Sequence, residues 1–123
     1  MEKDLAKLWI EPLQSASKLI VVEGKKDRAA LENLGINNIY TLNKKPLYAC
    51  VEEILLLSKD VILLTDLDSE GKKLYSKLKK DLTERGIRID NYFREFLFKN
   101  TKFRQIEGLA SSVNKSFNKQ THS

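Results

Sequence analysis

Residues Val61–Gly71 read VILLTDLDSEG, so that an uninterrupted apolar run passes straight into an acidic turn. A short, β-branched apolar run bounded by turn residues is typical of a strand buried on both faces, as in a parallel sheet. The run Leu19–Val22 has the same character, and it leads into Glu23 and Gly24. Each run is followed by a helical pattern, which indicates βαβ units.

Strand-like and helical segments alternate outward from these two runs. Further strands are predicted at 39–42 and 87–89, the second of them at a sheet edge, and helices are predicted to start near residues 25, 46, 72 and 91. The prediction is an α/β fold with a central, mostly parallel four-stranded sheet flanked by helices.

One domain is predicted to span residues 1–113. It comprises an N-terminal helix at 2–16, which Pro12 is expected to end or bend, a core at 18–90 and a C-terminal helical extension at 91–113. Residues 114–123 are polar and are expected to form a flexible tail.

Several classes of chemistry are excluded by residue counts. The chain has one Cys and one His, which rules out an internal disulfide and a Cys/His zinc site. The single histidine, His122, lies in the polar tail, so a catalytic unit built on histidine has no well-placed base. The sequence has no membrane-length apolar run and no secretory signal, and we expect a cytoplasmic protein without a membrane partner.

The formal net charge is +5, and the excess lies entirely in the second half of the chain. Residues 1–60 contain nine basic and nine acidic residues, whereas residues 61–123 contain thirteen basic and eight acidic residues. This distribution favours a polyanionic partner.

Acidic residues follow two of the predicted strands: Glu23 after the first, and Asp66 and Asp68 after the third. If those strands are neighbours at the point where strand order reverses, the three carboxylates converge. Oxygen ligands of this kind favour Mg²⁺ or Mn²⁺, and Gly24 and Gly71 are expected to let the backbone turn sharply beside them. The alternative is that Asp68 or Ser69 caps the following helix and Glu23 is a surface residue.

Other interpretations of the acidic turn agree less well with the sequence. A calcium-binding EF-hand loop needs a glutamate at its twelfth position, where this chain has Lys77. A haloacid-dehalogenase-type phosphatase usually has Thr or Val four residues after the first aspartate, where this chain has Glu70. No Walker-type phosphate loop is present.

The ordered pair of segments Val21–Asp27 and Leu64–Gly71, which read VVEGKKD and LTDLDSEG, resembles the Toprim domain of topoisomerases, primases, OLD-type nucleases and recombination proteins. Small stand-alone Toprim proteins and the Toprim ribonuclease that matures 5S ribosomal RNA are the most similar members, and the resemblance covers roughly 18–90. It implies a Rossmann-like Toprim domain.

The resemblance also implies roles for individual residues. Glu23 corresponds to the general acid or base of nucleotidyl transfer or phosphodiester cleavage, Asp66 and Asp68 to the Mg²⁺ ligands, and Glu70 to an assisting acid. Glu23 and Glu70 are also candidate metal ligands. The chain lacks the tyrosine-bearing domain of topoisomerases and the zinc module of primases, so a minimal Toprim protein that binds without turnover stays open.

Cations near the acids are the candidates for nucleic-acid contacts: Lys25, Arg28, Lys72 and Lys73. Residues 92–104 interleave aromatic and basic side chains, which could stack on bases and meet phosphates. The alternative is that Phe93, Phe96 and Leu97 pack a helix onto the sheet.

We therefore expect a Mg²⁺-dependent Toprim protein that acts on RNA or DNA phosphodiesters, first as a nuclease or processing factor. A non-catalytic nucleic-acid-binding or scaffold module is the alternative, and a small-molecule phosphohydrolase is a more remote one. A homodimer is left open as the assembly state.

Overall fold

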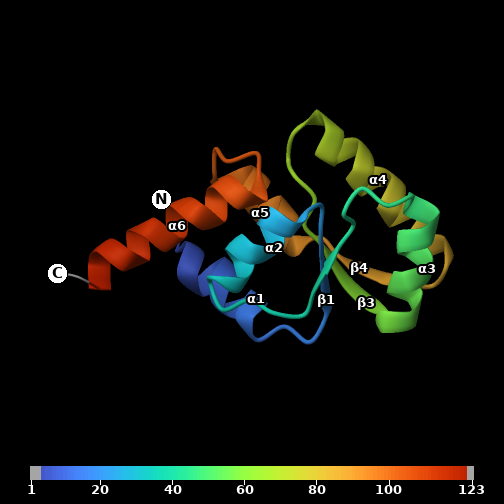
Figure 1. Cartoon of the computed structure of the whole chain (residues 1–123), viewed down its shortest axis with the longest axis horizontal. Helices are drawn as coiled ribbons and strands as arrows, with labels where there is room; N and C mark the ends of the chain where they lie inside the picture. The colour runs from blue at the N-terminus through green and yellow to red at the C-terminus, as the bar shows by residue number, and fades with distance from the viewer. Residues whose placement is uncertain (1–3, 122–123) are drawn as a thin grey trace.

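A four-stranded parallel sheet forms the centre of the protein (Figure 1), seen in a computed structural model that describes residues 4–121. The strand order is β2-β1-β3-β4, so the two apolar runs lie next to each other in the middle and the predicted edge strand is at the edge. All three pairings are parallel, where the sequence predicted a mostly parallel sheet. The strands are β1 (Leu19–Val22), β2 (Ile39–Thr41), β3 (Asp60–Leu63) and β4 (Arg88–Asp90).

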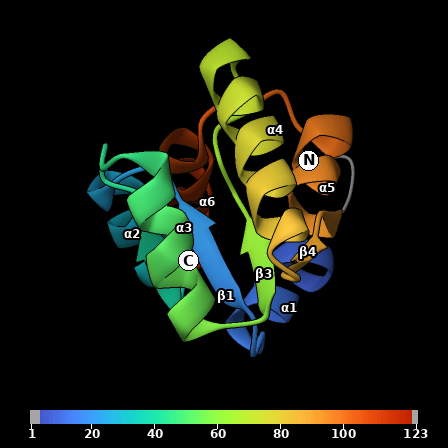
Figure 2. The ribbon, with the colours of Figure 1, turned by 90° about the vertical axis from the view of Figure 1, so that its right-hand side faces the viewer.

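Helices cover both faces of the sheet, because alternate residues of each central strand point to opposite sides (Figure 2). Ile20 and Ile62 pack under α2, α5, α6 and the N-terminal helix. Val21 and Leu63 pack under α3 and α4. The helices are α1 (Glu11–Gln14), α2 (Lys25–Glu32), α3 (Leu47–Leu57), α4 (Ser69–Glu84), α5 (Tyr92–Asn100) and α6 (Ile106–Thr121).

The N-terminal helix does not end at Pro12 as expected. A π-helical turn, Ala6–Ile10, runs directly into α1, so Pro12 lies within a continuous helical segment although it cannot donate a backbone hydrogen bond to the preceding turn. The segment is held by Trp9, whose indole N–H donates to the carbonyl of Phe93 at 2.9 Å. Residues 1–3, where the predicted helix begins, lie outside the described residues.

The C-terminal helical extension is longer than predicted, because α6 continues past residue 113 to Thr121. Leu109, Ala110 and Val113 are buried in the core cluster that contains α2, so the helix has an apolar stripe with which to dock before its polar end. The remainder of the predicted tail, including His122, lies outside the described residues.

The packing interpretation of α5 is confirmed for three residues: Phe93, Phe96 and Leu97 are all buried in the core. Within residues 4–121, no helix combines the length and the apolar character needed to cross a membrane.

Candidate metal and nucleic-acid site

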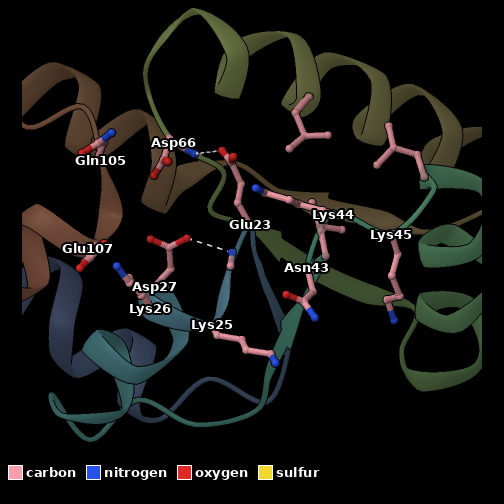
Figure 3. Close-up of a pocket in the computed structure, with 14 residues that line it drawn as sticks. Glu23, Lys25, Lys26, Asp27, Asn43, Lys44, Lys45, Asp66, Gln105 and Glu107 are labelled. Carbon is pink, nitrogen blue, oxygen red and sulfur yellow. Dashed lines mark hydrogen bonds between the residues drawn. The ribbon is translucent and has the colours of Figure 1, made fainter.

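The loops that follow β1 and β3 meet at the carboxyl end of the sheet. β1 and β3 are direct neighbours, with Ile20 paired to Ile62, and the strand order reverses between them. The Glu23 carboxylate accepts a hydrogen bond from the backbone N–H of Asp66 at 2.7 Å (Figure 3). Two residues 43 positions apart in the chain are thereby joined at the switch point, as the sequence predicted for adjacent strands.

Asp66 also binds the C-terminal helix. Its Oδ1 accepts from the N–H of Ile106, the first residue of α6, at 2.9 Å. A carboxylate at a helix N-terminus is stabilised by the free N–H groups and the helix dipole. This contact was missed from the sequence, because nothing in the spacing of residues 66 and 106 indicates that α6 begins beside the third strand.

Asp68 is the N-cap of α4. Its Oδ1 accepts from the N–H of Gly71 at 2.8 Å, so the capping interpretation is correct for this residue. Gly71 is required for close approach: a Cβ there would lie 2.9 Å from Asp66 Cα and would overlap the Asp66 carbonyl group. The loop and the first turn of α4 can pack this closely only with glycine at position 71.

Gly24 does not have the role that the sequence predicted for it. Its φ of −139° and ψ of 173° are extended values that any residue adopts, and a Cβ would be in ordinary contact with Asp27 at 3.8 Å. The Gly24 N–H instead donates to Asp27 Oδ2 at 3.0 Å, which closes the start of α2. Asp27 is thus a buried acid near the site, and its carboxylate stabilises the first turn of α2.

Burial and mutual repulsion raise the pKa values of the carboxyl groups here. The pKa of Glu23 is raised first by burial and then by the charges of Asp66, Asp68 and Asp27, against the lowering effect of the Asp66 N–H. The pKa values of Asp27 and Asp66 are raised for similar reasons, with Glu107 of α6 adding to the repulsion. Glu107 is a further acid that sequence reasoning missed.

One arginine, Arg94, is hydrogen-bonded to the backbone of the loop that carries Asp66 and Asp68. Arg94 of α5 donates to the carbonyls of Thr65 at 3.2 Å and Asp66 at 2.9 Å, and it lies over the Tyr75 ring at 4.3 Å. Burial lowers the pKa of Arg94, and the charges of Tyr75, Glu23, Asp66 and Asp68 act in the opposite direction. Its positive charge in turn lowers the pKa of Asp66.

The site offers carboxylate oxygens, which are the ligands that Mg²⁺ prefers, but it brings together fewer acids than the sequence predicted. Glu23, Asp66 and Asp68 each use one carboxylate oxygen in the bonds described above, and each has a second oxygen. Nevertheless, the described residues contain no group of three His, Cys, Asp or Glu side chains that could hold a metal ion. Glu70 is exposed in the first turn of α4. The arrangement agrees with an ion held by one or two carboxylates together with water and phosphate.

A cleft of about 610 Å³ opens beside the acids (Figure 3). Lys25, a candidate for nucleic-acid contact from the sequence, lines the cleft, and so do Lys26, Lys44 and Lys45. The sequence analysis missed Lys44, although the Asn43-Lys44 pair follows the end of β2 after one residue, Leu42, at the same edge of the sheet. Figure 3 shows the Lys44 side chain pointing toward Glu23.

The other predicted cations lie elsewhere. Arg28 is paired with Glu32 at 3.3 Å on the exposed side of α2. Lys72 lies at a separate hollow between α4 and α5, and Lys73 is exposed on α4 without lining the cleft.

Lys45 is in the cleft but is paired with Glu53 at 2.8 Å. Lys25, Lys26 and Lys44 are therefore the cleft cations without a carboxylate within 4.0 Å among the described residues.

The fold and the acids at its switch point define a doubly wound α/β domain with a carboxylate site. The sequence matches the family model of the Toprim domain over residues 17–92, and the chain belongs to this family. It is 36% identical over 107 residues to a UPF0292 protein of Methanocaldococcus jannaschii, with 84% of each chain covered. It is 35% identical to a UPF0292 protein of Pyrococcus abyssi, covering 85% of this chain and 79% of that protein.

A solved structure of a protein from Aquifex aeolicus has the same fold. It is 36% identical to this chain, with a TM-score of 0.79, and the match covers 86% of this chain and 98% of that one. The predicted membership of the Toprim family and the predicted fold are thereby confirmed. The family suggests a metal-dependent function related to nucleic acids.

Proposed function

We propose that this protein is a Mg²⁺-dependent enzyme that cuts or processes RNA or DNA phosphodiesters at the Glu23–Asp66 site. The observation that carries the proposal is the Glu23 carboxylate held against the Asp66–Asp68 loop at the switch point. Phosphoryl transfer depends mainly on positioning and on neutralisation of charge. A divalent ion bound by the Asp66 and Asp68 carboxylates would supply that neutralisation and polarise the phosphate.

Glu23 is the proton carrier in this proposal. One of its oxygens is fixed by the Asp66 N–H, which orients the group, and the other has no hydrogen-bond partner among the described residues. A carboxyl group whose pKa is raised toward neutrality takes and returns a proton more effectively than an ordinary one. Glu23 would therefore activate the attacking water or protonate the leaving oxygen.

The cleft lysines bind the strand. Lys25 lies in the first turn of α2, where the N–H groups of the helix also attract phosphate, and Lys44 approaches from the loop after β2. Asn43 and Lys44 both have left-handed backbone angles, φ 52° and 60°, and the Asn43 N–H donates to the Glu23 carbonyl at 2.9 Å. This bond ties the lysine-bearing loop to the residue that carries the proton.

The test is cleavage of end-labelled single-stranded, duplex and hairpin RNA and DNA with Mg²⁺, Mn²⁺ or EDTA. We expect cleavage that needs the metal ion and falls by about 100-fold or more in Glu23→Gln and in Asp66→Asn. Glutamine and asparagine keep the oxygens that accept from Asp66 and Ile106, so the fold is preserved. Asp60→Asn, at the opposite end of β3, is the control and should cut normally. Undiminished cleavage by the Glu23→Gln/Asp66→Asn double variant would assign the activity to a contaminant.

A second candidate is a binding module that does not cut. It is favoured by the use of Asp66 and Asp68 as helix caps and by the lack of a three-ligand group in residues 4–121. This candidate predicts no cleavage with any divalent ion and an affinity for RNA or DNA that falls steeply with salt. Binding that is insensitive to salt would exclude it.

A further inference from the structure

Phe98 is an aromatic residue of α5 whose side chain is not buried in the core. Its neighbours Phe93, Phe96 and Leu97 are buried, whereas 48% of Phe98 remains exposed. The ring borders a hollow of about 390 Å³ between α4 and α5, which lie side by side (Figure 2). The fold of this chain does not require an aromatic ring at this surface position.

Cations surround this ring. Lys72 Nζ of α4 lies 5.2 Å from the ring centre, and the Arg104 guanidinium, from the loop before α6, lies at 5.4 Å. Lys99 and Arg94 also line the hollow, and Glu95 is the acid among its lining residues. A partly exposed aromatic ring with a surplus of positive charge matches a ligand that is both aromatic and anionic, as nucleotides are.

The ring is coupled to the acidic loop through the backbone. Arg104 accepts a hydrogen bond at its carbonyl from the N–H of Leu67, at 2.7 Å, and Lys72 donates through its N–H to the carbonyl of Asp68, at 2.9 Å. The two residues that flank Phe98 are thus bonded to the loop that carries Asp66 and Asp68.

We propose that Phe98, Lys72 and Arg104 form a stacking platform for an unpaired base of single-stranded RNA or DNA. The inference rests on the proposed function, since the bound strand is its substrate. The phosphates draw Lys72 and Arg104 toward the backbone, and a base takes their place against the ring. A duplex keeps its base faces stacked inside, so the platform selects single strands or loops. Because every base has an aromatic face, the platform binds with little sequence preference.

The direct test uses Phe98→Trp, because the natural tryptophan, Trp9, is fully buried. The new indole should be exposed, and titration with oligo(dT) or oligo(U) in EDTA, where no strand is cut, should quench its emission. Tyr48→Trp is the matched control, since Tyr48 is an exposed aromatic residue of α3, and its emission should stay constant. Equal quenching in both variants, or none in Phe98→Trp, overturns the inference.

Affinity supplies the second measurement. Phe98→Ala should weaken binding of labelled single strands by about 5- to 100-fold in fluorescence anisotropy, while Tyr48→Ala binds as the natural protein does. Circular dichroism checks that both variants are folded, and Phe98→Trp should restore binding. Unchanged affinity in folded Phe98→Ala overturns the platform.

The outcomes for the platform and for the enzyme are separable. If the natural protein cuts nucleic acid and Phe98→Ala binds and cuts normally, the inference fails and the proposed function stands. If binding depends on Phe98 but no ion supports cleavage, the enzyme proposal fails and the platform is supported as part of a binding module.

Discussion

The acidic side chains at the two ends of the sheet have different partners. At the start of β3, Asp60 is paired with Arg88 through two bonds, and Lys18, which precedes β1, is paired at 2.9 Å with Asp90, the last residue of the short edge strand β4. At the carboxyl end, Glu23 and Asp66 have backbone N–H groups as partners, and within residues 4–121 no cation lies within 4.0 Å of either carboxylate. Asp60 and Asp90 are neutralised by cationic side chains of the protein itself. The carboxyl end retains negative charge that a bound ion can neutralise.

The largest effect on stability is expected from Gly71→Ala. The new methyl group overlaps the Asp66 carbonyl, so the loop and α4 must separate, and the free energy of unfolding should fall by about 3 kcal/mol or more in urea denaturation. Gly24→Ala is the control at the other motif glycine. There a Cβ makes ordinary contact, and the change should be under about 1 kcal/mol. Equal effects of the two substitutions would contradict the close-approach role of Gly71.

Arg94→Met should have the next largest effect. It leaves the Thr65 and Asp66 carbonyls without their partly buried donor, at a cost of about 2 kcal/mol in the free energy of unfolding. Arg85→Met replaces an exposed arginine at the end of α4 and should change little. The loss of a positive charge should also raise the pKa of Asp66 further, which carboxyl-carbon NMR can follow. If both variants unfold alike, Arg94 does not hold the loop.

The acids at the carboxyl end should make the protein more stable in mild acid than at neutral pH. Their pKa values are raised in the folded state, above ordinary values of 4.5 for Glu23 and 3.8 for Asp66, so the folded state binds protons that the unfolded chain releases. This contribution is present below the ordinary value and is lost as pH rises through the folded-state value. It amounts to about 1.4 kcal/mol for each unit by which a pKa is raised.

Urea denaturation between pH 4.5 and pH 8 measures this dependence. The Glu23→Gln variant should show a flatter profile, because the neutral amide does not repel Asp66. A profile as steep as that of the natural chain would mean that the Glu23 carboxylate carries no unfavourable charge.

The smallest effect is expected at the opposite end of the sheet. Lys18→Met breaks the ion pair with Asp90, whose side chains are 41% and 22% exposed, and should change the free energy of unfolding by less than about 1 kcal/mol. Added Mg²⁺ should stabilise this variant as much as the natural protein, since the ion binds at the other end. A loss of the Mg²⁺ effect in Lys18→Met would place the ion elsewhere.

The fold could be predicted from the sequence because its signals are local. Continuous apolar runs at Leu19–Val22 and Val61–Leu64 indicate buried parallel strands. Gly35 and Gly86, with φ values of 78° and 86°, end helices as C-cap glycines do. The length of α6 was not predictable in this way, because what stabilises it is burial of Leu109 and Val113 against α2 rather than its polar sequence.

The site was predictable where it depends on strand ends and not where it depends on packing. Glu23 and Asp66 follow directly from adjacent strands. Three further features depend on contacts between elements that share no sequence pattern. They are the bond from Asp66 to α6, the bonds from Arg94 to the acidic loop, and the position of Lys44 in the cleft. The single-sequence pattern also could not distinguish an aspartate that binds metal from one that caps a helix, since both follow a strand.

The central claim is that the unneutralised carboxylates bind a divalent ion, and calorimetric titration with Mn²⁺ at neutral pH tests it most directly. The natural protein should bind the ion, and the Asp66→Asn/Asp68→Asn variant, whose amide oxygens still accept the two helix-capping bonds, should remain folded and lose the binding. An absence of Mn²⁺ binding by the natural protein, or equal binding by the folded variant, would contradict the account.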